Sequence, residues 1–137
     1  MTTNRYALET SFVIDYWNGE PFARHFFENL EVDADVGVPT VALFELYAGA
    51  LLSDSPNEDI ATVTDDLSFA EPLPLTNDSA QDAAQIHAEL LGQGNRIQLP
   101  DVLNAATARS ADATLVATDG QFERIDDLAV YNPREEQ

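Results

Sequence analysis

The 137-residue sequence contains no cysteine and no lysine. The lack of cysteine excludes disulfides and thiolate metal sites, and it fits an intracellular protein. All six basic residues are arginines, against 25 acidic residues, which gives a formal net charge of −19. No apolar run approaches the roughly 18 residues of a membrane-spanning helix, and no signal-peptide pattern opens the chain. We therefore expect a soluble, cytoplasmic protein.

The excess of acidic residues fits either a disordered chain or a folded protein suited to high salt. A hydrophobic content of 45% and clear apolar periodicity favour the folded protein. In molar salt the Debye length is only about 3 Å, so self-repulsion is screened. An acid-rich composition without lysine is similar to that of proteins from extreme halophiles. The net charge consequently does not indicate whether nucleic acid is a partner.

The length fits one domain over residues 1–137, with a polar tail at residues 132–137. The patterning predicts an α/β fold in which helices alternate with the short strands of a mostly parallel sheet. Strands are expected at residues 5–8, 69–75, 113–117 and 128–131, with a turn and short strand at 33–38. Helices are expected at residues 12–17 (capped by Thr10 or Ser11), 21–29, 41–52, 56–66, 78–91 and 101–108.

The most informative stretch is residues 99–122, LPDVLNAATARSADATLVATDGQF. Asp101 lies in the first turn of a small-residue helix, and Asp119 follows the short apolar run ATLVA. In parallel α/β sheets, ligands bind beyond the carboxyl ends of the strands. Asp119 is expected at such an end, where other carboxylates could join it.

Four acidic residues stand out by their context: Glu9, Glu45, Asp101 and Asp119. Each also has a simple structural explanation. Glu9 could be solvated after an edge strand, and Glu45 could pair with a core arginine. Asp101 suits a first helical turn, and Asp119-Gly120 suits a turn.

If these four carboxylates face one cleft, they cannot all stay ionised without compensation. Hard divalent cations with oxygen ligands, Mg²⁺ or Mn²⁺, are the natural compensation. Such a site suits phosphoryl-transfer chemistry, in which metal ions activate water and neutralise charge. No P-loop, dinucleotide-binding or zinc motif offers another chemistry.

With those residues placed, the chain resembles PIN-domain proteins, specifically the VapC toxins of type II toxin–antitoxin systems. The motifs that carry the resemblance are ETSFVIDYWNG, TVALFELYAG, LPDVLNAATA and ATLVATDGQFERI. The resemblance implies a three-layer α/β/α fold, Mg²⁺-dependent RNA cleavage (with Mn²⁺ as an alternative ion), a VapB-like antitoxin partner and a homodimer. It also implies that the catalytic and metal-binding residues are Glu9, Glu45, Asp101 and Asp119.

Two positions depart from the family pattern. Glu9 stands where VapC-like proteins usually have Asp, which moves the carboxylate one methylene outward. Ala117 stands where the family often has Thr or Ser, and Thr118 is adjacent to it. Ser11, Asn104 and Thr118 are expected to support the metal ligands, with Asn104 one turn after Asp101 on the same helix face.

Two other functions stay open. Glu9 leaves room for a PIN module that is catalytically weak or silent and acts by binding. An RNA-maturation nuclease without an antitoxin is the other alternative. The aromatic residues of the first two expected helices are read as core, or as part of a groove for an antitoxin segment: Tyr16, Trp17, Phe22, Phe26 and Phe27.

Overall fold

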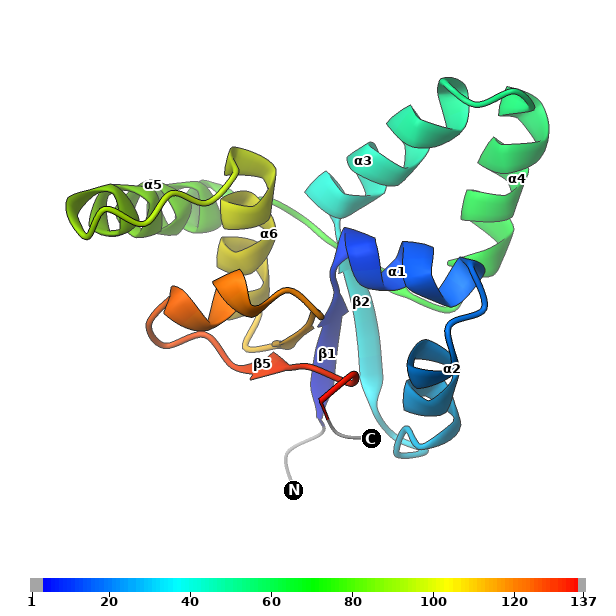
Figure 1. Ribbon diagram of the computed structural model, residues 1–137, viewed down its shortest axis with the longest axis horizontal. Coiled ribbons are helices and arrows are strands. Elements are labelled where there is room, and N and C mark those ends of the chain that lie inside the picture. The colour runs from blue at the N-terminus through cyan, green and yellow to red at the C-terminus, as the bar shows by residue number, and fades with distance from the viewer. Residues whose placement is uncertain (1–3, 136–137) are drawn as a thin grey trace.

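A five-stranded parallel sheet forms the centre of the protein, whose computed structural model describes residues 4–135 (Figure 1). The strand order is β3-β2-β1-β4-β5, and every neighbouring pair is parallel. The strands are β1 (Arg5–Leu8), β2 (Asp35–Pro39), β3 (Glu71–Leu73), β4 (Thr114–Val116) and β5 (Val130–Tyr131). The expected α/β class and its parallel sheet are confirmed.

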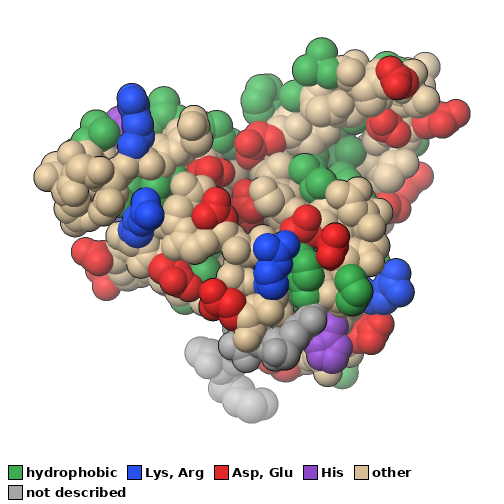
Figure 2. Space-filling model, in the orientation of Figure 1, with side chains coloured by type: hydrophobic (Ala, Val, Ile, Leu, Met, Phe, Trp, Pro, Cys, Tyr) green, Lys and Arg blue, Asp and Glu red, His purple; other side chains and the backbone are tan. Residues whose placement is uncertain are grey.

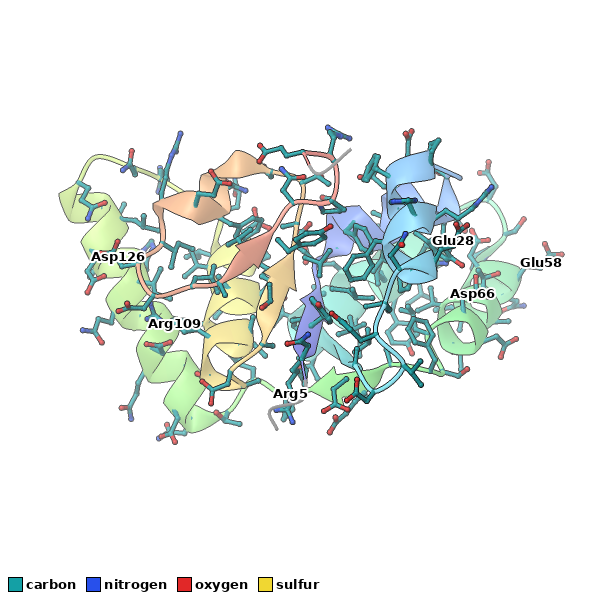
Figure 3. All side chains as sticks on the ribbon, turned by 90° about the horizontal axis from the view of Figure 1, so that it is seen from below. Arg5, Glu28, Glu58, Asp66, Arg109 and Asp126 are labelled. Carbon is teal, nitrogen blue, oxygen red and sulfur yellow. The ribbon has the colours of Figure 1, made fainter. Side chains whose placement is uncertain are left out.

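Helices cover both faces of the sheet, which gives the expected three layers (Figure 3). On one face lie α5 (Asn77–Gly92) and α6 (Leu99–Ser110). On the other lie α1 (Thr10–Trp17), α2 (Pro21–Glu28), α3 (Thr40–Leu51) and α4 (Pro56–Asp66). In the described part of the chain, no helix is long and apolar enough to span a membrane.

Successive side chains of the central strands point to opposite faces of the sheet, so they contribute to two separate hydrophobic cores. Ala7 and Leu115 pack in the core under α5 and α6. Their neighbours Leu8 and Val116 pack in the core under α1 to α4. All four are fully buried, as expected for a parallel sheet covered on both faces.

The start of α1 differs from the prediction. Glu9, rather than Thr10 or Ser11, is the N-cap residue, and its side chain accepts a hydrogen bond from the Ser11 amide. Its backbone is extended (φ −77°, ψ 151°) because its own amide still pairs with the Val116 carbonyl of β4. The residue that directly follows β1 therefore also caps α1.

The turn after β4 also contains more structure than its sequence indicated. Asp119 caps a short 3₁₀ helix, η1 (Gly120–Arg124), whose Phe122 is 1% exposed. Residues 132–135 of the expected polar tail pack against the rest of the protein. Pro133 is buried, and Arg134 lies over the Phe22 ring. Residues 136 and 137 of that tail lie outside the described residues.

Most aromatic residues of α1 and α2 lie in the hydrophobic core or pack against it, which agrees with the first of the two interpretations of these residues. Phe26 is buried and contacts the rings of Phe12 and Phe27 at centroid distances of 5.3 Å. Tyr16 extends the cluster to the surface, where it is 41% exposed.

Candidate functional site

The sheet brings the ends of distant segments together at one edge. Because β1 lies between β2 and β4 and all three are parallel, their carboxyl ends meet at the same side of the sheet (Figure 1). Glu9 directly follows β1, and Asp119 lies three residues after β4. Glu45 is in the second turn of α3, which begins where β2 ends, and α6 packs against α3 and carries Asp101.

Glu9 is the most enclosed of these acids, with 3% of its surface exposed. It follows the central strand of the sheet, so the explanation as a solvated residue beyond an edge strand is wrong. Its Oε2 accepts the Ser11 amide at 2.9 Å. A hydrogen bond from a backbone amide offsets part of the free-energy cost of burying a carboxylate.

Glu45 has no arginine partner among the described residues, so the ion-pair explanation is also wrong. Its Oε1 accepts the Thr10 hydroxyl at 2.7 Å and the Asn104 side-chain amide at 3.1 Å. These donors come from α1 and α6, so three helices meet at this carboxylate. The ion pair seen in the described part of the chain, Arg109–Asp82 at 2.6 Å, lies between α6 and α5, on the side of the molecule where Figure 3 labels Arg109.

Asp101 and Asp119 are joined through one glutamine. The Gln121 side-chain amide donates to Asp101 Oδ2 at 3.0 Å, and its backbone amide donates to Asp119 Oδ1 at 3.0 Å. Asp101 is partly buried, whereas Asp119 is exposed at the rim of the site.

The acids interact electrostatically. Burial raises the pKa of Glu9 from its ordinary 4.5 to about 7, and the charges of Asp101 and Glu45 add to the rise against the opposing effect of the Ser11 amide. Burial also raises the pKa of Asp101, with further contributions from Glu45 and Asp119. Glu9, Glu45 and Asp101 therefore form one cluster, and Asp119 is coupled to it through Asp101. Acidic side chains also gather in the hollow between α3 and α6 in Figure 2.

The donor set fits a hard divalent cation. Among the described residues, the hydrogen bonds to Glu45, Asp101 and Asp119 each engage one carboxylate oxygen and leave the other without a protein donor. Glu9 accepts the Ser11 amide through Oε2, and the Phe12 amide also stabilises its charged form. The Asn104 Oδ1 atom beside Glu45 is buried and has no hydrogen-bond partner in the described part of the chain. Oxygen ligands without a neutralising arginine or lysine are what Mg²⁺ and Mn²⁺ bind.

The side chains are not already gathered around one point. Within residues 4–135, no three acidic or histidine side chains are arranged closely enough to hold a metal ion as they stand. Binding an ion through three of these carboxylates would therefore require them to lie closer together than they do in this structure.

The three residues expected to support the metal ligands differ in their contacts with the four acids. Asn104 donates to Glu45, and Ser11 contributes its backbone amide while its side chain is exposed. Thr118 contributes a carbonyl that accepts the Asn132 side-chain amide at 3.3 Å. Thr10 and Gln121 were missed as site residues. Thr10 was interpreted only as a helix cap, and no local pattern indicates that Gln121 reaches Asp101.

Comparison with known proteins agrees with this architecture. The PIN domain family model matches residues 6–128. Ribonuclease VapC2 of Haemophilus influenzae is 33% identical over 131 residues, which cover 93% of this chain and 97% of that protein.

Solved structures are similar over nearly the whole chain. VapBC2 from Rickettsia felis, bound to a DNA fragment from its promoter, has a TM-score of 0.87 at 25% identity over 93% of this chain and 98% of its own. DNA-bound VapBC from Salmonella typhimurium has a TM-score of 0.85 at 26% identity over 96% and 99%.

The fold and site thus define an α/β/α protein with a carboxylate cluster at the carboxyl edge of a parallel sheet. The chain belongs to the PIN-domain family, and its similarity lies with the VapC-like members.

Proposed function

We propose that this protein is a metal-dependent endoribonuclease and the toxin of a type II toxin–antitoxin pair. The observation that carries the proposal is the cluster of Glu9, Glu45 and Asp101, which is coupled to Asp119 and has no neutralising cation among residues 4–135. The similarity to a ribonuclease VapC2 supports RNA as the substrate class.

In this proposal Glu9 and Asp101 hold the principal Mg²⁺ or Mn²⁺ ion, and Glu45 and Asp119 are further ligands or orient water. A bound ion of this kind supplies activated water and neutralises the charge that develops on the phosphodiester. Thr10 and Asn104 hold the Glu45 carboxylate through Oε1, which leaves Oε2 without a donor from the described residues. Cleavage by in-line attack of water leaves a 5′-phosphate and a 3′-hydroxyl.

The direct test is cleavage of structured RNA by the purified protein in molar KCl with Mg²⁺ or Mn²⁺. Asp101→Asn should reduce cleavage to background, because it removes one carboxylate and preserves the side-chain shape. Glu58→Gln is the matched control, since Glu58 is exposed on α4. Equal cleavage by the Asp101→Asn variant would refute the assignment, and an inactive but folded wild type would favour the silent binding module.

The proposed protein partner is a VapB-like antitoxin. Two observations support it: the similar solved structures are VapBC complexes, and a cavity of about 420 Å³ opens beside Glu45. The apolar part of its lining includes Ile14, Trp17 and Leu46, which suits a bound apolar segment. A small reading frame adjacent to this gene whose product co-purifies with the chain would support the pair. If no such partner exists, an RNA-maturation nuclease becomes the better assignment.

A homodimer is the proposed assembly of the chain without antitoxin. Exposed apolar side chains on and after α3 support it: Phe44 at 68%, Leu51 at 62% and Leu52 at 88%. Sedimentation equilibrium in molar KCl tests it, with twice the chain mass as the expected result.

A further inference from the structure

Gln121 touches two acids of the site through two different groups. Its side-chain amide nitrogen lies 3.0 Å from Asp101 Oδ2, and its backbone nitrogen lies 3.0 Å from Asp119 Oδ1. Asp101 is on α6 and Asp119 follows β4, so one residue links acids from two elements.

The position of Gln121 is set by its neighbour. Phe122 is 1% exposed and belongs to the same core cluster as Val102 and Ala105 of α6. Burial of Phe122 in this core anchors η1 next to Gln121, and it does not depend on the Gln121 side chain. Replacing that side chain therefore removes the bond to Asp101 and leaves the backbone bond to Asp119 in place.

A glutamine offers a donor without a charge. An arginine here would neutralise Asp101 and compete with a divalent cation, whereas an amide leaves the carboxylate fully negative. The amide takes Oδ2 only, so Asp101 Oδ1 has no donor among the described residues.

We propose that Gln121 is a positioning residue of the metal site, which restrains the Asp101 carboxylate through Oδ2, leaves Oδ1 available as a ligand, and ties Asp101 to Asp119. The inference rests on the proposed function, because it gives one residue a role at the same carboxylate site. In the competing arrangement, the Gln121 amide binds the same Asp101 oxygen that would coordinate the cation, and it therefore weakens metal binding. The two arrangements predict opposite changes in metal affinity.

The experiment measures Mn²⁺ binding to the full chain by isothermal titration calorimetry in molar KCl. Gln121→Met keeps the length and shape of the side chain and removes the amide donor. Gln98→Met is the matched control, because Gln98 is exposed just before α6 and its side chain makes no capping bond. Gln121→Asn is a second variant, whose amide is too short to reach Asp101 from the same backbone position.

Both Gln121 variants should bind Mn²⁺ about 10-fold or more weakly, as loss of a group that orients a metal ligand typically does. Gln98→Met should bind like the wild type, and the thermal midpoint without metal should stay close to the wild-type value in all three variants. RNA cleavage by Gln121→Met should need more Mn²⁺ but reach the wild-type plateau, since only binding of the ion is weakened.

Unchanged or tighter Mn²⁺ binding by Gln121→Met and Gln121→Asn would overturn the inference, and tighter binding would identify the amide as a competitor. A wild type that binds no Mn²⁺ would overturn the proposed function itself, and the inference with it. The wild-type titration therefore separates the two failures.

Discussion

Glu9 is the residue at which the fold imposes the largest electrostatic cost. It is 3% exposed, it lies near two other carboxylates, and its pKa rises to about 7. Since the folded state holds this proton more tightly than the unfolded state, Glu9 favours folding below about pH 4.5. That contribution is lost as the pH rises towards 7.

Because the pKa of Glu9 is raised in the folded state, the free energy of unfolding should depend on pH. Without metal, Glu9→Gln should match the wild type near pH 4.5 and exceed its unfolding free energy by about 3 kcal/mol above pH 7. Urea unfolding of both proteins across this range measures the difference. A constant difference at all pH values would show that Glu9 titrates normally.

Glu9 also stands where VapC-like proteins usually have Asp. The additional methylene makes octahedral Mg²⁺ geometry harder to reach, because Mg²⁺ tolerates little distortion. Glu9→Asp should therefore raise Mg²⁺-supported cleavage several-fold relative to Mn²⁺-supported cleavage. An unchanged ratio of the two rates would show that the length of this side chain does not select the ion.

The four acids were selected from sequence by context: Glu9 and Asp119 follow strands, Glu45 interrupts an apolar helix, and Asp101 opens a helix. Their hydrogen-bond partners were harder to predict. Thr10 donates across to α3, and Gln121 reaches α6 from a 3₁₀ helix that the sequence showed only as a turn. Such contacts depend on packing between elements far apart in the chain, and no local pattern encodes them.

At the scale of elements, helix and strand positions followed from apolar spacing and turn residues. The match is exact for Arg5–Leu8, and the helix predicted to begin near residues 56–57 and to end at Asp66 is α4 (Pro56–Asp66). Strand pairing was predicted only as mostly parallel. The order of the strands requires long-range contacts, such as the packing of Gly37 against β3.

Gly37 allows β2 and β3 to approach closely. A Cβ atom there would lie 2.7 Å from Leu73 Cγ and 2.9 Å from the Glu71 carbonyl oxygen, which is backbone and cannot rotate away. Gly37→Ala should therefore cost about 1–3 kcal/mol of unfolding free energy. Thermal or urea unfolding measures this loss.

Gly49 is the matched control for Gly37. It lies in α3, and nothing comes within 4 Å of an added Cβ. Gly49→Ala should stabilise the protein by about 1 kcal/mol through helix propensity. If both alanine variants changed stability in the same direction, close approach at Gly37 would not be the reason for its glycine.

At the scale of the whole molecule, the net charge of −19 dominates. Repulsion among the acids opposes the compact state at low ionic strength, and salt screens it. The thermal midpoint should therefore rise steeply from dilute buffer to molar KCl. KCl is preferable to sulfate salts, which strengthen hydrophobic burial independently of screening. A midpoint that does not depend on KCl would contradict adaptation to high salt.

We propose above all that the carboxylates at the carboxyl ends of the strands bind a divalent cation. Titration of Mn²⁺ into the wild type, Asp101→Asn and Glu58→Gln in molar KCl tests it most directly. We expect one saturable high-affinity class of sites in the wild type and in Glu58→Gln, and its loss in Asp101→Asn with the fold intact. Equal Mn²⁺ binding by all three proteins would contradict the claim, because the acidic surface rather than the cluster would then hold the ion.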